Sequence, residues 1–287
     1  MQSVGIVGVG LIGGSFGLAL RAAGFTGRIV GVSSPRTIDE AIACGAIDAG
    51  VPLDEAASGC DLIYVAQPIS TIKDTLVLLG SIASENCLIT DVGSTKVEIV
   101  ETAKRFIMRA QFLGGHPMAG KESRGVASAS ADLFRGRPYI FTPSEPARLH
   151  TPAASVFISW VERFGANTVT VTPQEHDRAV AFISHLPQLI STGLAACLAE
   201  RLDNIDNLRL AGPGLTDMSR LAMSSYEIWR DIVDTNTENV GHALSVYIDK
   251  LTELRDNLQT HRLGDVFATA AEIAQRIRQQ NNNKGQV

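Results

Sequence analysis

The chain has 287 residues, of which 45% are hydrophobic, and this is enough material for two domains of ordinary size, each with its own core. The formal net charge is −5 and the lysines and arginines are scattered, so we expect neither nucleic acid nor an anionic membrane surface as a partner. The sequence opens directly on a strand-like run, Met1 to Val9, and no segment approaches about 20 uninterrupted apolar residues, which predicts a cytoplasmic protein.

The first half of the chain alternates short apolar runs with segments of helical period, a pattern typical of βαβ units on a parallel sheet. The expected strands are Val4 to Val9, Arg28 to Val32, Asp61 to Ala66 and Cys87 to Thr90, and the expected helices are Leu11 to Ala23, Thr37 to Cys44, Ile69 to Ile82 and Lys96 to Phe106. Pro138 to Phe141 predicts a further strand ahead of a proline- and serine-containing stretch, Thr142 to Pro152, and Asn167 to Val171 a last one.

The second half changes character after Thr172. The run Thr172-Pro173-Gln174-Glu175 is typical of a capping box with proline at the first helical position. From there to Gln280 the helical period is interrupted at Leu186-Pro187, at residues 204–207 and at residues 211–214. We therefore predict a dinucleotide-binding domain at 1–172, an all-α domain at 173–280 and a disordered tail at 281–287.

The apolar faces of the helical half exceed what one short bundle needs, which indicates a core shared in a homodimer. Examples are Leu189, Ile190, Leu194, Cys197 and Leu198.

The cysteines are widely spaced, without a CxxC pair, and we interpret them as reduced apolar side chains. They are Cys44, Cys60, Cys87 and Cys197. No cluster of histidine, cysteine or carboxylate residues has metal-ligand spacing, so we predict no metal site.

A glycine fingerprint, Gly8-Val9-Gly10-Leu11-Ile12-Gly13, follows a predicted strand and opens a predicted helix. Gly8 permits the tight turn, Gly10 lets the backbone approach a pyrophosphate, and Gly13 lets the helix pack on the strand. Leu11 and Ile12 lie in the same turn. The pattern predicts an α/β Rossmann domain that binds a nicotinamide dinucleotide.

The end of the second strand indicates which dinucleotide binds. An NAD site usually has Asp or Glu there, whereas this chain has Ser33, Ser34, Pro35 and Arg36. Hydroxyls and a guanidinium could hold a 2′-phosphate, so NADP is favoured and NAD remains possible; Arg36 could equally be a solvated loop residue. We also assign Gln67 and Pro68, just after a buried strand, to the cofactor site.

Four further segments carry candidate chemistry. They are Asp91 to Lys96 after a buried strand, Gly114 to Gly120 with a histidine in a rigid loop between glycines, His185 to Gln188 at a predicted kink, and Asp217 to Arg220. With the glycine fingerprint, and with Glu122, Gly125 and Trp229-Arg230-Asp231, they make the chain resemble the prephenate and arogenate dehydrogenase family of tyrosine biosynthesis, from about Val4 to about His242.

The resemblance implies a dinucleotide-binding domain followed by a helical dimerisation domain, and oxidative decarboxylation of a cyclohexadienol. The reaction needs a base for a hydroxyl proton, and His116 is the residue we choose, since a neutral imidazole suits that task. The family pattern places Ser94 beside the hydroxyl and matches Arg220 to the arginine that holds the ring carboxylate.

Structural roles are the alternative at several of these positions. His185 could bind substrate or satisfy a backbone carbonyl freed by Pro187. Lys96 could be a solvated residue at a helix start, and Trp229 could belong to the core. His176, in a first helical turn between two acidic residues, is predicted to be solvated.

Two positions depart from the family pattern. Lys121 stands where many relatives have a small hydroxyl residue, and a cation there would attract the keto-acid side chain of prephenate and repel the ammonium of arogenate. Gln188 stands where a histidine is frequent; it can still hydrogen-bond a side-chain carbonyl or carboxylate, but it carries no charge, which weighs against a preference for prephenate.

Prephenate dehydrogenase activity, giving 4-hydroxyphenylpyruvate, is therefore the predicted function, and arogenate dehydrogenase activity is the close alternative. More distant alternatives are a β-hydroxyacid dehydrogenase or imine reductase, and a nucleotide-binding sensor without catalysis. Ser94, His116 and Arg220 argue against these.

Overall fold

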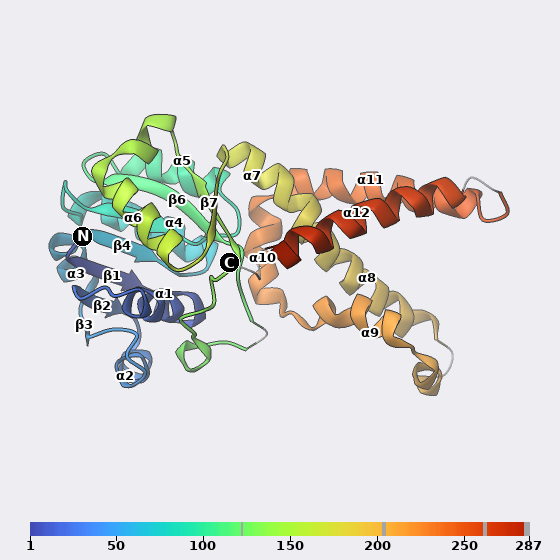
Figure 1. The fold of residues 1–287 in the computed structure, drawn as a ribbon, viewed down its shortest axis with the longest axis horizontal. Coiled ribbons are helices and arrows are strands. Elements are labelled where there is room, and N and C mark those ends of the chain that lie inside the picture. Colours follow the sequence, from blue (N-terminus) through green and yellow to red (C-terminus); the bar gives the residue numbers. More distant parts are fainter. Residues whose placement is uncertain (122, 203–204, 261–262, 284–287) are drawn as a thin grey trace. The chain divides into compact units, whose positions relative to one another are not determined.

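The computed structural model describes residues 1–121, 123–202, 205–260 and 263–283, and this part of the chain divides into two compact units. The first, Met1–His176, is an α/β domain, and the second, from Asp177 onward, is helical (Figure 1). Both parts of the predicted fold class are confirmed. The division falls inside α7 (Pro173–Val180), the helix that the capping box starts.

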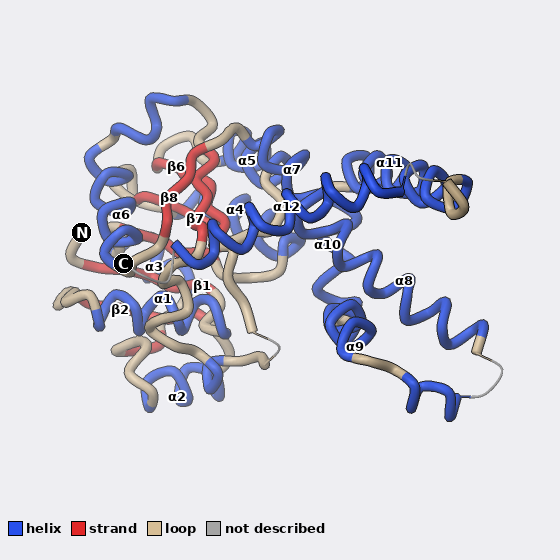
Figure 2. The backbone as a smooth tube through the Cα atoms, turned by 45° about the vertical axis from the view of Figure 1, so that its right-hand side comes forward, coloured by secondary structure: helices blue, strands red, loops and turns tan. Residues whose placement is uncertain are grey.

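One mostly parallel sheet forms the centre of the first unit. In the described residues its order is β3-β2-β1-β4-β5-β6-β7-β8. Strand β7 runs antiparallel to its neighbour β6, and β8 pairs parallel to β7. Figure 2 shows the strands in red. The strands are β1 (Ser3–Val7), β2 (Arg28–Val32), β3 (Ala49–Gly50), β4 (Leu62–Val65), β5 (Leu88–Asp91), β6 (Gln111–Pro117), β7 (Pro138–Thr142) and β8 (Asn167–Thr170).

The order of the strands reverses at β1. The chain runs from β1 outward to β2 and β3, and then returns to β4 on the other side of β1. Ligands of open α/β sheets bind where the order reverses, outside the carboxyl ends of the strands. The glycine fingerprint after β1 and Gln67 after β4 both lie at this point.

Helices pack on both faces of the sheet. The crossovers on the two sides of β1 run in opposite directions, and because each is right-handed, their helices lie on opposite faces. Phe16 of α1 stacks on Tyr64 at 3.7 Å between ring centroids and meets Phe157 of α6 edge-on at 6.1 Å, so α1 and α6 share one face and one aromatic core. The helices are α1 (Leu11–Ala22), α2 (Pro35–Ala43), α3 (Leu53–Gly59), α4 (Ile69–Ile82), α5 (Val97–Phe106) and α6 (Pro152–Arg163), with short 3₁₀ turns η1 (Val126–Ser128) and η2 (Pro146–His150).

Several elements of this unit differ from the sequence-based expectation. The short β3, the seven-residue α3, and α6 were not predicted. The predicted rigid loop around His116 is wrong, because residues 111–117 form β6 and the glycines pair within the sheet. Helix α2 starts at Pro35 instead of Thr37, because Ser34 caps it by accepting a hydrogen bond from Thr37 N.

The second unit consists of α-helices, short 3₁₀ segments and the π-helical turn η3. Helix α8 packs against α9 and η5, and α10 packs against α11. Figures 1 and 2 show α12 running back along α11. The elements are η3 (Ala181–His185), α8 (Leu186–Arg201), η4 (Ile205–Leu210), α9 (Pro213–Ser219), η5 (Arg220–Met223), α10 (Tyr226–Thr235), α11 (Thr237–Asp256) and α12 (Leu263–Asn283).

Two boundaries in this unit also differ from expectation. The interruption expected at Leu186-Pro187 lies a few residues earlier: the π-helical turn η3 separates α7 from α8, and Pro187 stands in the first turn of α8, where a missing backbone N–H costs no helical hydrogen bond. Helix α12 continues through Asn283, and hence through the first residues of the predicted tail, since the sequence has neither proline nor glycine between Gly264 and Gly285. The rest of that tail, residues 284–287, lies outside the described residues.

One helical stretch, Pro173–Arg201, is long and apolar enough to cross a membrane by length and composition alone. His176, Asp177, His185 and Gln188 are nevertheless buried on it against other parts of the protein. Buried polar side chains with protein partners are typical of a helix inside a folded core.

Candidate active site

The glycine turn has the shape that a dinucleotide needs. Gly8 has φ +90°, and a Cβ there would lie 2.3 Å from the Ala66 carbonyl oxygen, so only glycine fits. A Cβ on Gly13 would lie 2.2 Å from the Gly8 carbonyl oxygen, which explains how closely α1 approaches the strand. A Cβ on Gly10, in contrast, would meet nothing within 4 Å. The backbone is therefore open to a ligand at Gly10 and closed at Gly8 and Gly13.

The N-terminus of α1 is available to an anion. Its N-cap is Gly10, which has no side chain to satisfy the first backbone N–H groups, and the first turn carries no acidic residue. These N–H groups and the positive end of the helix dipole suit a pyrophosphate. Leu11 and Ile12 are half-buried in this first turn. The residues present therefore fit a dinucleotide phosphate.

Gln67 and Pro68 border the same turn. A Cβ on Gly8 would lie 2.9 Å from Gln67 Cγ, and Thr75 Oγ1 donates to Gln67 Oε1 at 2.7 Å, which fixes the amide. Pro68 is the exposed N-cap of α4.

The residues predicted to bind a 2′-phosphate are exposed at the end of β2. Ser33 and Ser34 are both accessible, and Ser34 also caps α2. Arg36 has a side chain that is 90% exposed, and its Nε donates to Glu40 Oε1 at 2.9 Å. Arg36 thus lies in the first turn of α2, shortly after the end of β2.

His116 is buried near the carboxyl end of β6, where it pairs with Ile140 of β7. Its Nδ1 lies 2.8 Å from Nε2 of His176, and the two rings meet edge-on with centroids 5.0 Å apart. The prediction that His176 is solvated is therefore wrong: this side chain is 1% exposed. It is buried because β6 lies against the turn that starts α7, a contact between residues far apart in sequence.

A buried ion pair fixes the strand that carries His116. Lys96 Nζ contacts Asp91 Oδ2 and donates to the Gly115 carbonyl oxygen at 2.7 Å, and both side chains are fully buried. Asp91 also accepts backbone N–H groups from Gly93 at 2.7 Å and from Gly115 at 3.2 Å. Both backbone groups of Gly115 are thus held by one ion pair, which rules out a solvated Lys96. Ser94, half-buried, lies in the turn between the two charged residues.

A second buried histidine, His185, lies in the helical unit at the end of η3. Asn236 Nδ2 donates to the Asp177 carbonyl oxygen at 2.8 Å and lies 3.3 Å from His185 Nδ1, while Asn236 Oδ1 accepts from Asn239 Nδ2 at 2.7 Å. Since that network leaves the amide nitrogen facing His185, its Nδ1 accepts and its Nε2 carries the proton in the neutral ring. The Trp229 ring packs edge-on against it at 5.9 Å.

Comparison with known proteins identifies the family. Residues 16–180 match the family model described as the prephenate dehydrogenase nucleotide-binding domain, and residues 172–281 match that of the prephenate dehydrogenase dimerization domain. The chain is 32% identical to the prephenate dehydrogenase of Bacillus subtilis over 275 residues, which cover 91% of this chain and 71% of that protein. It belongs to the prephenate dehydrogenase family.

Two solved structures resemble the whole chain. Prephenate dehydrogenase from Aquifex aeolicus, in complex with hydroxyphenyl propionate and NAD+, has a TM-score of 0.85 at 30% identity and covers 97% of this chain and 98% of its own. Synechocystis arogenate dehydrogenase has a TM-score of 0.81 at 30% identity and covers 96% and 99%. Relatives of both activities therefore share this fold.

The candidate residues that the family resemblance supplied lie in both units. Ser94 and His116 lie in the first unit: Ser94 follows the carboxyl end of β5, and His116 lies near the carboxyl end of the neighbouring strand β6. Arg220, which is exposed, begins η5 in the second unit. Gln188 Nε2 donates to the Leu221 carbonyl oxygen at 2.8 Å, which fixes the residue next to Arg220.

The two departures from the family pattern have protein partners. Lys121 is exposed, and its Nζ donates to the Ser128 carbonyl oxygen at 2.8 Å; Glu122, beside it, lies outside the described residues. Gln188 donates its second amide hydrogen to Thr192 Oγ1 at 3.2 Å. Any substrate contact of Gln188 therefore falls to its amide oxygen.

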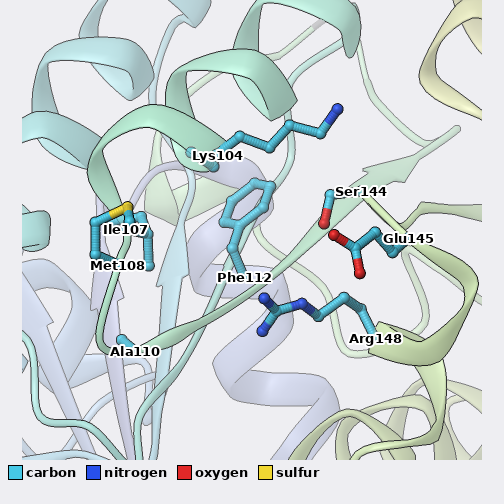
Figure 3. A pocket seen from close by; sticks show the side chains of 9 residues that line it. Lys104, Ile107, Met108, Ala110, Phe112, Ser144, Glu145 and Arg148 are labelled. Atoms are coloured by element: carbon cyan, nitrogen blue, oxygen red, sulfur yellow. The ribbon is translucent and has the colours of Figure 1, made fainter.

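A separate hollow of about 340 Å³ lies near the start of β6, at the edge of the sheet opposite the glycine turn (Figure 3). The Phe112 ring stands at its centre between Lys104 and Arg148, which belong to α5 and η2. Because it lies away from the carboxyl ends of the parallel strands, we assign neither cofactor nor substrate to it. Among the described residues, no group of three or more His, Cys, Asp or Glu side chains could hold a metal ion.

Sequence reasoning missed two residues of this site. His176 gave no signal, because a histidine in a first helical turn is usually solvated. Asp91 lay in a segment singled out for its hydroxyl and ammonium, but its carboxylate was not assigned a role. A buried strand that ends in Asp, with a lysine five residues later, is the signal that could have indicated the ion pair.

Proposed function

We propose that this chain catalyses the oxidative decarboxylation of prephenate to 4-hydroxyphenylpyruvate with a nicotinamide dinucleotide, in tyrosine biosynthesis. The observation that carries the proposal is His116: a buried imidazole near a strand end, bonded at Nδ1, on the strand next to the one that Ser94 follows and on the same sheet edge as the glycine turn. Membership of the prephenate dehydrogenase family supports the substrate class.

The chemistry assigns one task to each of three side chains. The bound nicotinamide supplies the acceptor for the hydride that leaves the hydroxyl-bearing ring carbon. His116 accepts the hydroxyl proton, Ser94 orients that hydroxyl or the imidazole, and Arg220 holds the ring carboxylate through its planar fork. Loss of carbon dioxide then gives the aromatic ring, so the enzyme needs no further acid or base for that step.

Initial rates of reduced-cofactor formation, measured with prephenate and with arogenate, each with NADP and with NAD, test the function. His116→Asn should lower kcat by about 10² to 10⁴-fold, the usual contribution of a general base. His150→Asn, at an exposed position in η2, is the matched control and should leave kcat unchanged. Full turnover by His116→Asn would favour a different base, and no turnover by the wild type would favour the nucleotide-sensor alternative.

We infer a preference for prephenate over arogenate from Lys121. Its exposed ammonium adds positive charge to a loop that follows β6, the strand of His116. A cation there favours a side chain that ends in a keto acid over one that carries an ammonium. Lys121→Thr should lower the ratio of prephenate to arogenate activity, and an unchanged ratio would contradict the assignment. The likeness to Synechocystis arogenate dehydrogenase keeps arogenate as the second candidate.

We also propose that NADP is preferred to NAD. The end of β2 offers two exposed serines and an exposed guanidinium, and no carboxylate follows until Asp39. Arg36→Ala should raise the KM for NADP several-fold and leave the KM for NAD unchanged. Equal effects on both KM values would mean that Arg36 does not contact a 2′-phosphate. The NAD+ in the Aquifex aeolicus structure belongs to that protein.

A homodimer is the assembly we propose. The match to the dimerization-domain model supports it, as do large apolar side chains that α11 and α12 leave exposed. They include Ile248 at 57%, Leu251 at 46%, Phe267 at 72%, Ile273 at 51% and Ile277 at 55% exposure.

A further inference from the structure

The pairing of His116 with His176 constrains where protons can be. The line between His116 Nδ1 and His176 Nε2, 2.8 Å long, has room for one hydrogen. Two neutral arrangements exist. In one, His116 donates from Nδ1, and its Nε2 carries no proton and can accept one. In the other, His176 donates from Nε2, and His116 carries its own proton on Nε2, where it cannot act as a base.

We propose that His176 is a positioning residue that holds His116 in the first of these arrangements. It accepts the Nδ1–H of His116 through Nε2 and carries its own proton on Nδ1. When His116 takes the substrate proton on Nε2, the same hydrogen bond stabilises the imidazolium. This is the part that the third group plays in a nucleophile–base–orienter arrangement, with a neutral ring in place of a carboxylate. The inference rests on the proposed role of His116 as base.

The start of α7 holds His176 in place. Thr172 Oγ1 accepts from Glu175 N at 3.2 Å, and Glu175 Oε2 accepts from Thr172 N at 2.9 Å, which completes the capping box. His176 N donates to the Thr172 carbonyl oxygen at 2.9 Å. The backbone of His176 is thereby fixed within the first turn, and burial at 1% exposure fixes its ring.

The helix dipole disfavours a second proton on His176. The ring lies in the first turn of a helix, where the positive end of the dipole disfavours an imidazolium. Among the residues that the structure describes, ionisable groups next to the pair include Glu175 and Asp177, on either side of His176, and Asp91 and Lys96, which hold Gly115 next to His116. Glu175 is engaged by the capping box, and Asp91 and Lys96 neutralise each other. The added proton is therefore best accommodated on His116.

The tautomer can be measured without turnover. In protein labelled with ¹⁵N-histidine, two-bond ¹H–¹⁵N correlation spectra at neutral pH report which ring nitrogen carries the proton, and the His116→Asn and His176→Gln variants assign the signals among the six histidines. We expect an Nδ1–H, Nε2-acceptor pattern at His116. A protonated Nε2 at His116 in the free enzyme would overturn the proposal, whatever the activity.

Kinetics separate positioning from simple packing. His176→Leu removes the acceptor, so kcat should fall on the order of 100-fold, and the acidic limb of the kcat/KM profile should move to lower pH because the imidazolium loses its partner. His176→Gln, whose amide oxygen can take the place of Nε2, should restore kcat to within about tenfold and return the limb toward its wild-type position. The dissociation constant for NADPH and the Tm of each variant check that cofactor site and fold are intact.

Two results would overturn the proposal: equal losses of kcat in the Leu and Gln variants, or a limb that stays in place in His176→Leu. A wild-type enzyme inactive on both prephenate and arogenate would instead refute the proposed function, and the NMR result would still decide the tautomer.

Discussion

The buried ion pair of Asp91 and Lys96 allows a quantitative prediction. Lys96→Met keeps most of the volume of the side chain and removes its charge. It leaves a carboxylate at 0% exposure without its cation, and it leaves the Gly115 carbonyl oxygen without its donor. The substitution should therefore destabilise the first unit far more than the loss of a surface lysine does.

The expected magnitude follows from these contacts. Removal of one partner from a buried ion pair costs about 3 to 5 kcal/mol. Asp91 still accepts hydrogen bonds from the backbone N–H groups of Gly93 and Gly115, so the loss of its cation should cost about 3 kcal/mol, near the lower end of that range. The Gly115 carbonyl oxygen, which loses its donor, adds about 1 kcal/mol. We expect the free energy of unfolding to fall by about 4 kcal/mol in total. Addition of Asp91→Asn should recover at least about 1 kcal/mol, since the stranded charge is then removed.

Urea unfolding in a Trp229→Phe background is the assay, because Trp160 of α6 then reports on the first unit alone. The control is Lys104→Met, which breaks an exposed pair with Glu101 on α5 and should cost less than about 1 kcal/mol. A loss below about 1 kcal/mol for Lys96→Met, or a double variant less stable than the single one, would refute the reasoning.

Three further predictions concern the glycine turn, the thiols and the dimer. Gly8→Ala should lower Tm, because the φ of +90° at Gly8 and a nearby carbonyl oxygen exclude a Cβ. Gly10→Ala should leave Tm unchanged and weaken NADPH binding at least tenfold in a fluorescence titration. Equal Tm values for the two variants would contradict the different roles of these glycines. Burial raises the pKa of Cys87 to about 12, so at pH 8 a disulfide reagent should label exposed Cys44 in the native protein and Cys87 only after unfolding. Since the folded-state pKa exceeds the unfolded value of about 9, Cys87 should also lower stability as pH rises from about 9 toward 12. Phe267→Asp should convert a dimer to monomers in light scattering, and an unchanged mass would place the interface elsewhere.

Local patterns determined much of the fold and the cofactor site. Alternating apolar runs and helical periods predicted most of the parallel strands, and the glycine fingerprint after β1 placed the cofactor turn, because these signals are contained in a few consecutive residues. The structure adds the reason for each glycine: Gly8 and Gly13 have no room for a Cβ, and Gly10 has room that a ligand can use. The strand of His116 was missed because its glycines are typical of a loop, although here they pair in the sheet centre.

The sequence by itself determined the fold class, the family and the residue types that the chemistry needs. Only the tertiary structure decided which of them act together. His116 and His176 are 60 positions apart, and Lys96 reaches a carbonyl oxygen 19 positions away, so no local period records either contact. Burial of a polar side chain depends on the partner that compensates it, and that partner comes from a different element of the fold. For this reason His176, whose acidic neighbours in the sequence predict exposure to solvent, can be buried against the candidate base His116.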